Sequence, residues 1–183
     1  MPRLTTWFHY GWNRPYYWDY GPGEYIYVYD DAVYVNDEYY APAPVYYERT
    51  RHLVETLPEL TEEEARQIEW LPLGVFAIAR EGSQQFDQLV QLAASKDGII
   101  GGTVFDEANG QAYPVEGKVD EQTQRAVWGF TDASGSRIYM ETGIYNLTKE
   151  AATALVHYGP QDIEIRQLVR LEEPDPAATA STQ

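Results

Sequence analysis

The N-terminal third of the chain shows the alternating pattern of a β-strand. Residues 25–29 read YIYVY, which places tyrosines on one face and Ile26 and Val28 on the other. Residues 33–35 are predicted as a second strand after a turn at Asp30 and Asp31. The Ala-Pro-Ala-Pro run at 41–44 is expected to be extended. This pattern predicts a tyrosine-rich β-ribbon over residues 16–52, packed on the rest of the chain because such a ribbon is marginal alone.

A helix is predicted in the segment that follows this ribbon. Thr61 and Glu64 have the spacing of a capping box, in which each side chain accepts a hydrogen bond from the other residue's backbone amide. Pro72 cannot continue a helix, so the helix is expected to run from Glu62 to about Trp70.

Two further helices are predicted from apolar stripes that follow capping residues. Ser83 is expected to cap the second helix and Thr148 the third, which Gly159 and Pro160 end. The stripes have helical spacing and consist of Phe86, Leu89, Val90 and Ala93 in one case and Ala151, Ala152, Leu155 and Val156 in the other.

Six segments have the pattern of strands in this part of the chain: 73–79, 99–105, 112–119, 125–130, 137–144 and 162–171. The four between 99 and 144 are separated by turn residues and are predicted to form a meander. One face of the meander is apolar, and the other is predicted to be solvated because it carries Glu116, Lys118, Arg125, Arg137 and Glu141. The alternation is the same in an open sheet and in a small barrel.

The predicted fold class is therefore α+β, with a mainly antiparallel β-meander sheet that is open or partly closed. The sequence divides into an N-terminal extension over 1–15, the ribbon over 16–52, an α+β domain over 53–173 and a tail over 174–183. The tail is predicted to be disordered because it lacks large apolar residues.

Composition excludes several classes of function. The chain has 183 residues, 13 Lys plus Arg against 29 Asp plus Glu, and a formal net charge of -16, which argues against binding to nucleic acid. The absence of cysteine removes disulfides and thiolate chemistry. No apolar run is long enough to span a membrane, and residues 1–20 lack the order of a signal peptide.

Candidate catalytic and metal-binding residues are few. The three histidines have no metal-binding spacing, and His157 is expected near a helix C-terminus, where it contacts the last carbonyls. Asp30, Asp31, Asp37 and Glu38 are explained by turns rather than calcium binding. Glu141 is the carboxylate to inspect first, although the strand alternation favours a solvated position. We predict no cofactor, no metal and no catalytic residue.

The N-terminal third is unusual in its aromatic content, because 12 of the 16 tyrosines precede Thr50. Aromatic rings are favoured in protein interfaces, and a row of exposed rings also stacks on sugars. The rings can equally cover the core, and this alternative stays open. The candidate binding residues are Trp18, Tyr25, Tyr27, Tyr29, Tyr34, Tyr39 and Tyr40.

Three stretches carry a resemblance to a known group of proteins: WDYGPGEYIYVYDDAVYVN from Trp18, EWLPLGVFAIA from Glu69 and METGIYNLTKEAATALVHYGP from Met140. They resemble planctomycete proteins labelled mu-protocadherin or putative cell-surface protein. The resemblance implies a bacterial protein that is exported or associated with the cell surface. It does not imply cadherin repeats, because the acidic calcium motifs of cadherins are absent and three helices do not suit their β-sandwich.

The leading functional hypothesis is a non-enzymatic interaction or structural module that binds a protein partner or a second copy of itself. The first alternative is a carbohydrate-binding module in which the tyrosines contact a polysaccharide. The second alternative is a hydrolase that uses Glu141 and another carboxylate.

Overall fold

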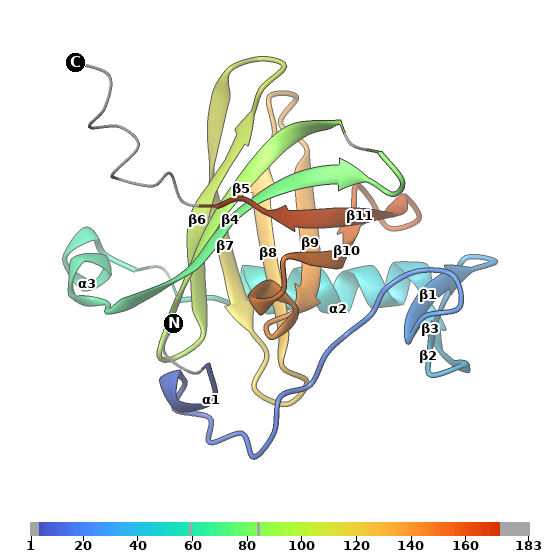
Figure 1. The fold of residues 1–183 in the computed structure, drawn as a ribbon, viewed down its shortest axis with the longest axis horizontal. Helices are drawn as coiled ribbons and strands as arrows, with labels where there is room; N and C mark the ends of the chain where they lie inside the picture. Colours follow the sequence, from blue (N-terminus) through green and yellow to red (C-terminus); the bar gives the residue numbers. More distant parts are fainter. Residues whose placement is uncertain (1–3, 59, 84, 173–183) are drawn as a thin grey trace.

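The structure is a computed structural model, and it describes residues 4–58, 60–83 and 85–172. Its main body is a closed antiparallel barrel, beside which lie a three-stranded sheet and a helix (Figure 1). The barrel strands are β4 (Trp70–Arg80), β5 (Phe86–Ser95), β6 (Ile99–Asp106), β7 (Gln111–Val119), β8 (Arg125–Thr131), β9 (Arg137–Gly143), β10 (Ala151–His157) and β11 (Ile163–Arg170). The predicted α+β class with a mainly antiparallel sheet is confirmed.

The closure of the barrel corrects the expectation of an open or partly closed sheet. Each strand pairs with its neighbour in the chain, and β11 returns to pair with β4. The six predicted strands are all present, but two segments predicted as helices are also strands. These additions bring the sheet to eight strands, a number at which a barrel closes around an interior that side chains can fill.

The second predicted helix is wrong because its segment forms β5. The apolar residues there satisfy two periods at once. Val90, Leu92 and Ala94 alternate along the strand and point into the barrel, where all three are buried. Pairing with β4 and β6 therefore outweighs the helical spacing of Phe86 and Leu89.

The third predicted helix is also wrong, and its segment forms β10. Thr148 ends a short 3₁₀ helix, η1 (Asn146–Thr148), instead of beginning an α-helix. Both faces of β10 are buried, with Ala154 and Val156 inside the barrel and Leu155 and His157 outside it. A strand buried on both faces reads as a continuous apolar run, which periodicity cannot tell from a helix.

Three α-helices occur among the described residues: α1 (Leu4–Trp7), α2 (Ala43–Glu55) and α3 (Glu62–Gln67). The predicted capping box of α3 is confirmed, since the Thr61 hydroxyl accepts from Glu64 N at 3.2 Å and Thr61 N donates to Glu64 Oε2 at 2.9 Å. The helix ends at Gln67, before the predicted Trp70, which opens β4. None of these helices is long and apolar enough to cross a membrane.

The expectation of an extended segment at 41–44 is confirmed for Ala41 and Pro42, which end β3, and is wrong for Ala43 and Pro44, which begin α2. Pro44 stands in its first turn, where a missing N–H costs no helical hydrogen bond. The helix lies along the outside of the barrel against β7, β8 and β9 (Figure 1).

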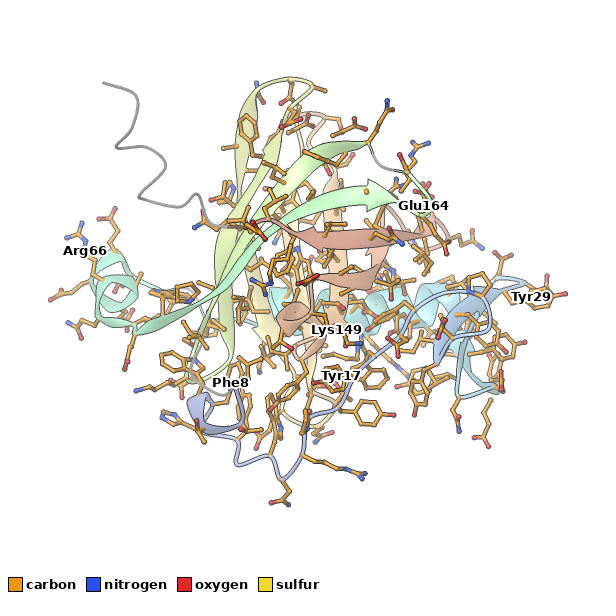
Figure 2. All side chains as sticks on the ribbon, in the orientation of Figure 1. Phe8, Tyr17, Tyr29, Arg66, Lys149 and Glu164 are labelled. Atoms are coloured by element: carbon orange, nitrogen blue, oxygen red, sulfur yellow. The ribbon has the colours of Figure 1, made fainter. Side chains whose placement is uncertain are left out.

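The N-terminal segment covers one end of the barrel. Leu4 and Phe8 join the barrel core, and Phe8 stands at the lower end of the molecule in Figure 2. The indole N–H groups of Trp7 and Trp12 donate to the carbonyls of Ala94 and Glu121, at 3.2 and 2.8 Å. The predicted disordered tail, residues 174–183, lies outside the described residues.

The predicted ribbon is a sheet of three strands, β1 (Ile26–Tyr29), β2 (Ala32–Val35) and β3 (Glu38–Pro42). Both residues at the tip of each hairpin, Asp30 with Asp31 and Asn36 with Asp37, have positive φ, as two-residue hairpin turns require. The inner face of the sheet carries Ile26, Val33 and Ala41, which are buried against Tyr46 of α2 and Leu155 of β10.

Candidate functional site

The outer face of the three-stranded sheet carries a cross-strand row of tyrosines. Tyr27, Tyr34 and Tyr39 are direct neighbours on β1, β2 and β3, and Tyr29 lies two residues beyond Tyr27 on the same face. We call these four residues the tyrosine face. The Tyr27 and Tyr34 rings are stacked at a centroid distance of 5.2 Å and an interplanar angle of 4°, and Tyr39 meets Tyr34 edge-on at 6.1 Å.

The tyrosine face is open to solvent. Tyr29 and Tyr39 are 69% and 60% exposed. Tyr29 stands at the far edge of the molecule, away from the barrel (Figure 2). The other two rings, Tyr27 and Tyr34, are half-buried and stack on each other. The sheet therefore has one face in the core and one aromatic face in water.

The remaining predicted binding residues lie elsewhere. Trp18 is buried, and its indole N–H donates to the carbonyl of Thr123 at 2.9 Å. Tyr25 is half-buried and packs edge-on against Trp18 at 5.5 Å. Tyr40 is 47% exposed but lies beside α2, where the guanidinium of Arg49 is 5.2 Å from the centre of its ring. The structure thus brings four of the seven predicted residues together and assigns Trp18 to the core.

Glu141 is buried, which corrects the prediction that it stands on a solvated face. Its strand β9 does turn it outward from the barrel, but α2 covers this position and leaves the side chain fully buried. Arg125 of β8, predicted to be solvated as well, lies beside it and forms an ion pair with Oε2. The other three residues of that face, Glu116, Lys118 and Arg137, are exposed or half-buried.

Helix α2 supplies two further donors to the Glu141 carboxylate. The Tyr46 hydroxyl donates to Oε1, and the Thr50 hydroxyl donates to Oε2 at 3.0 Å. Burial acts to raise the pKa of Glu141, but the Arg125 charge, the neighbouring His157 and the hydrogen bond from Tyr46 together outweigh burial and lower the pKa to about 2. The carboxylate is therefore ionised over the whole physiological pH range.

His157 completes this cluster from β10. Its Nε2 lies 3.8 Å from Glu141 Oε2, and its ring stacks on Tyr46 at 5.9 Å. Both ring nitrogens are buried without a hydrogen-bond partner among the described residues. His157 is thus in a strand within the cluster, which corrects its predicted place at a helix C-terminus.

The buried cluster suits structure better than catalysis. A general acid needs a raised pKa and access to substrate, whereas Glu141 has a lowered pKa and no exposed surface. Within the described ranges, no three His, Asp or Glu side chains come together so that they could hold a metal ion. The arrangement can hold α2 on the barrel through a charged, hydrogen-bonded contact.

Two members of the cluster were missed because α2 was not predicted. Tyr46 and Thr50 are four residues apart, a spacing that puts both on one face of a helix. The signal was present in the sequence, but the two prolines at 42 and 44 argued for an extended chain.

Comparison with known proteins gives no relative: no family model, curated protein or solved structure matches this chain. The resemblance to the planctomycete proteins therefore stays a prediction.

Proposed function

We propose that this chain is a non-enzymatic binding module whose tyrosine face docks on a basic surface of a partner protein. The observation that carries the proposal is the row of tyrosines held in water on the outer face of the three-stranded sheet. Exposed aromatic patches of this kind mark sites of interaction, and tyrosine is among the residues that dominate interface energies.

The tyrosine face is held rigid before any partner arrives. The sheet's inner face is anchored in the core by Ile26 and Val33, and two-residue turns fix the strand register. The rings also restrict one another through stacking. Binding of a partner therefore costs little additional side-chain entropy.

Charge indicates the chemistry of the partner. Exposed acids stand at both hairpin turns beside the tyrosine face, with Asp30 and Asp31 at one turn and Asp37 at the other, in a chain of net charge -16. Acids next to ring faces attract lysine and arginine through both ion pairs and cation–π contacts. The chain already holds its own Lys149 4.7 Å from the centre of the exposed Tyr17 ring.

Binding to defined peptides tests the proposal. The full chain is immobilised and titrated with lysine- and arginine-rich peptides and with sequence-matched glutamine peptides at physiological salt. We expect saturable binding of the basic peptides, weakened about tenfold or more by Tyr29→Ser with Tyr39→Ser. The matched control is Tyr17→Ser, because Tyr17 is also exposed but lies outside the sheet.

Equal affinity of wild type, the Tyr29/Tyr39 variant and the Tyr17 variant contradicts the proposal. That result assigns the binding to the overall negative charge and leaves no role for the tyrosine face.

The carbohydrate-binding alternative is less well supported by the ring geometry. A sugar stacks on a free ring face, whereas Tyr27 and Tyr34 turn their faces toward each other. Binding of a polysaccharide in a glycan array, lost in the Tyr29/Tyr39 variant, is the result that favours this alternative. The hydrolase alternative lacks an accessible carboxylate at Glu141.

A further inference from the structure

The end of the barrel opposite the N-terminal segment contains a cleft. It has a volume of about 480 Å³ and lies where β4, β6 and β11 reach the turns at that end. Ile78, Arg80, Gln88, Asp106, Tyr158 and Arg166 are among its lining residues. Figure 1 shows the β4–β5 and β10–β11 turns side by side at this end. Mouths of β-barrels are frequent places for small-molecule sites.

Two arginines form one wall of this cleft. Arg80 on β4 and Arg166 on β11 are direct cross-strand partners, and both line the cleft. Like charges in directly opposed positions destabilise a sheet. The pairing is also unexpected by composition, because the chain has only 13 Lys plus Arg among 183 residues.

The two arginines keep unused capacity to bind an anion. Arg166 Nη2 donates to the Tyr158 hydroxyl at 3.0 Å and lies 2.5 Å from Glu164 Oε2, which fixes the guanidinium through one of its nitrogens. Among the described residues, Arg80 has no ion-pair partner. A carboxylate or phosphate group between them would receive charge-assisted hydrogen bonds from both.

We propose that this cleft binds a small organic anion, with a single carboxylate or phosphate group held between Arg80 and Arg166. Two carboxylates, Asp87 and Asp106, also line the cleft; they disfavour a second anionic group and accept hydrogen bonds from the ligand body. Gln88, the cross-strand partner of both Ile78 and Asp106, offers further neutral hydrogen bonds. The ligand is therefore polar and carries one anionic group, with an apolar side against Ile78.

The ligand would remain at the mouth of the barrel. Large side chains such as Trp128, Phe76 and Phe130 fill the interior, and the N-terminal segment covers the other end. This site is separate from the tyrosine face and does not depend on the proposed partner.

The test uses three probes of one shape: benzoate, phenyl phosphate and the neutral benzamide. Each is titrated into the isotope-labelled full chain at low salt while the arginine Nε–H signals are followed by NMR. We expect saturable shifts of the Arg80 and Arg166 signals with at least one of the two anions. The anion that binds more tightly identifies the carboxylate or the phosphate as the preferred group.

Two variants accompany the titration. Arg80→Gln removes a group with no ion-pair partner among the described residues and should leave the fold intact while weakening anion binding about tenfold or more. Arg66→Gln is the control, because this arginine is 79% exposed on α3 and does not line the cleft, and it should change nothing. The proposal is overturned if neither anion causes a saturable shift, or if benzamide binds as tightly as the anions. It is also overturned if Arg66→Gln weakens anion binding as much as Arg80→Gln does.

Discussion

Replacing Glu141 with glutamine tests whether the buried cluster holds α2 on the barrel. The substitution keeps the shape of the side chain and removes its charge. The Arg125 side chain, 10% exposed, then has no counter-ion in a buried position. Leaving one member of a buried ion pair uncompensated costs about 3–5 kcal/mol. We expect Glu141→Gln to lower the free energy of unfolding at pH 7 by this amount.

The pH dependence gives a second, independent magnitude. The pKa of Glu141 is lowered from 4.5 to about 2 in the folded chain, so its stabilisation is complete above pH 4.5 and is lost as the pH falls toward 2. This shift corresponds to roughly 3 kcal/mol, of which about 2 kcal/mol is lost by pH 3. The stability difference between wild type and Glu141→Gln should therefore shrink by about 2 kcal/mol between pH 7 and pH 3.

Urea unfolding followed by tryptophan fluorescence measures both quantities, because Trp18 and Trp128 are buried. The control is Glu48→Gln, which removes a carboxylate of α2 that pairs with Arg51 at the surface and should cost less than about 1 kcal/mol. The reasoning is refuted if Glu141→Gln costs no more than this control, or if its cost is the same at pH 7 and pH 3.

Three further predictions test the fold by substitution. Gly117→Ala should lower the free energy of unfolding in urea by about 1–3 kcal/mol or more, because the new methyl group meets the Val127 carbonyl and lies 2.8 Å from Trp128 Cα. Gly159→Ala is the control and should be nearly neutral, because its methyl group meets nothing closer than 3.9 Å. Phe8→Ala should lower the free energy of unfolding by about 3–5 kcal/mol if the N-terminal segment is part of the barrel core; an unchanged value contradicts this. Thr61→Ala should lower the local stability of α3 by about 1 kcal/mol, which faster amide exchange in the helix would show. The melting temperature should change little, because no α3 residue is buried.

The sequence predicted those elements whose signals are local. The capping box at Thr61 is complete within four residues, and the alternation in residues 25–29 identifies β1 without reference to the rest of the chain. The turns at Asp30 and Asp31 likewise depend on two residues that tolerate positive φ. The tyrosine face could therefore be predicted. The sequence did not show which of the seven candidate binding residues lie on this face and which lie elsewhere.

The elements that depend on distant partners could not be predicted in this way. Strands β5 and β10 resembled helices because their apolar residues fit both periods, and only pairing with the neighbouring strands decides between them. The burial of Glu141 depends on α2, which lies more than 80 residues earlier in the chain. Strand alternation reports which way a side chain points, but it does not report what covers that face.

The most direct test of the binding proposal is to observe the tyrosine rings themselves. The full chain, labelled in its tyrosine rings, is titrated with the tightest-binding arginine-containing peptide and followed by NMR. The account predicts that the largest ring shifts belong to Tyr27, Tyr29, Tyr34 and Tyr39, with Tyr17 and the buried Tyr46 little affected. Shifts that are spread evenly over the exposed tyrosines, or that centre on Tyr17, would contradict it.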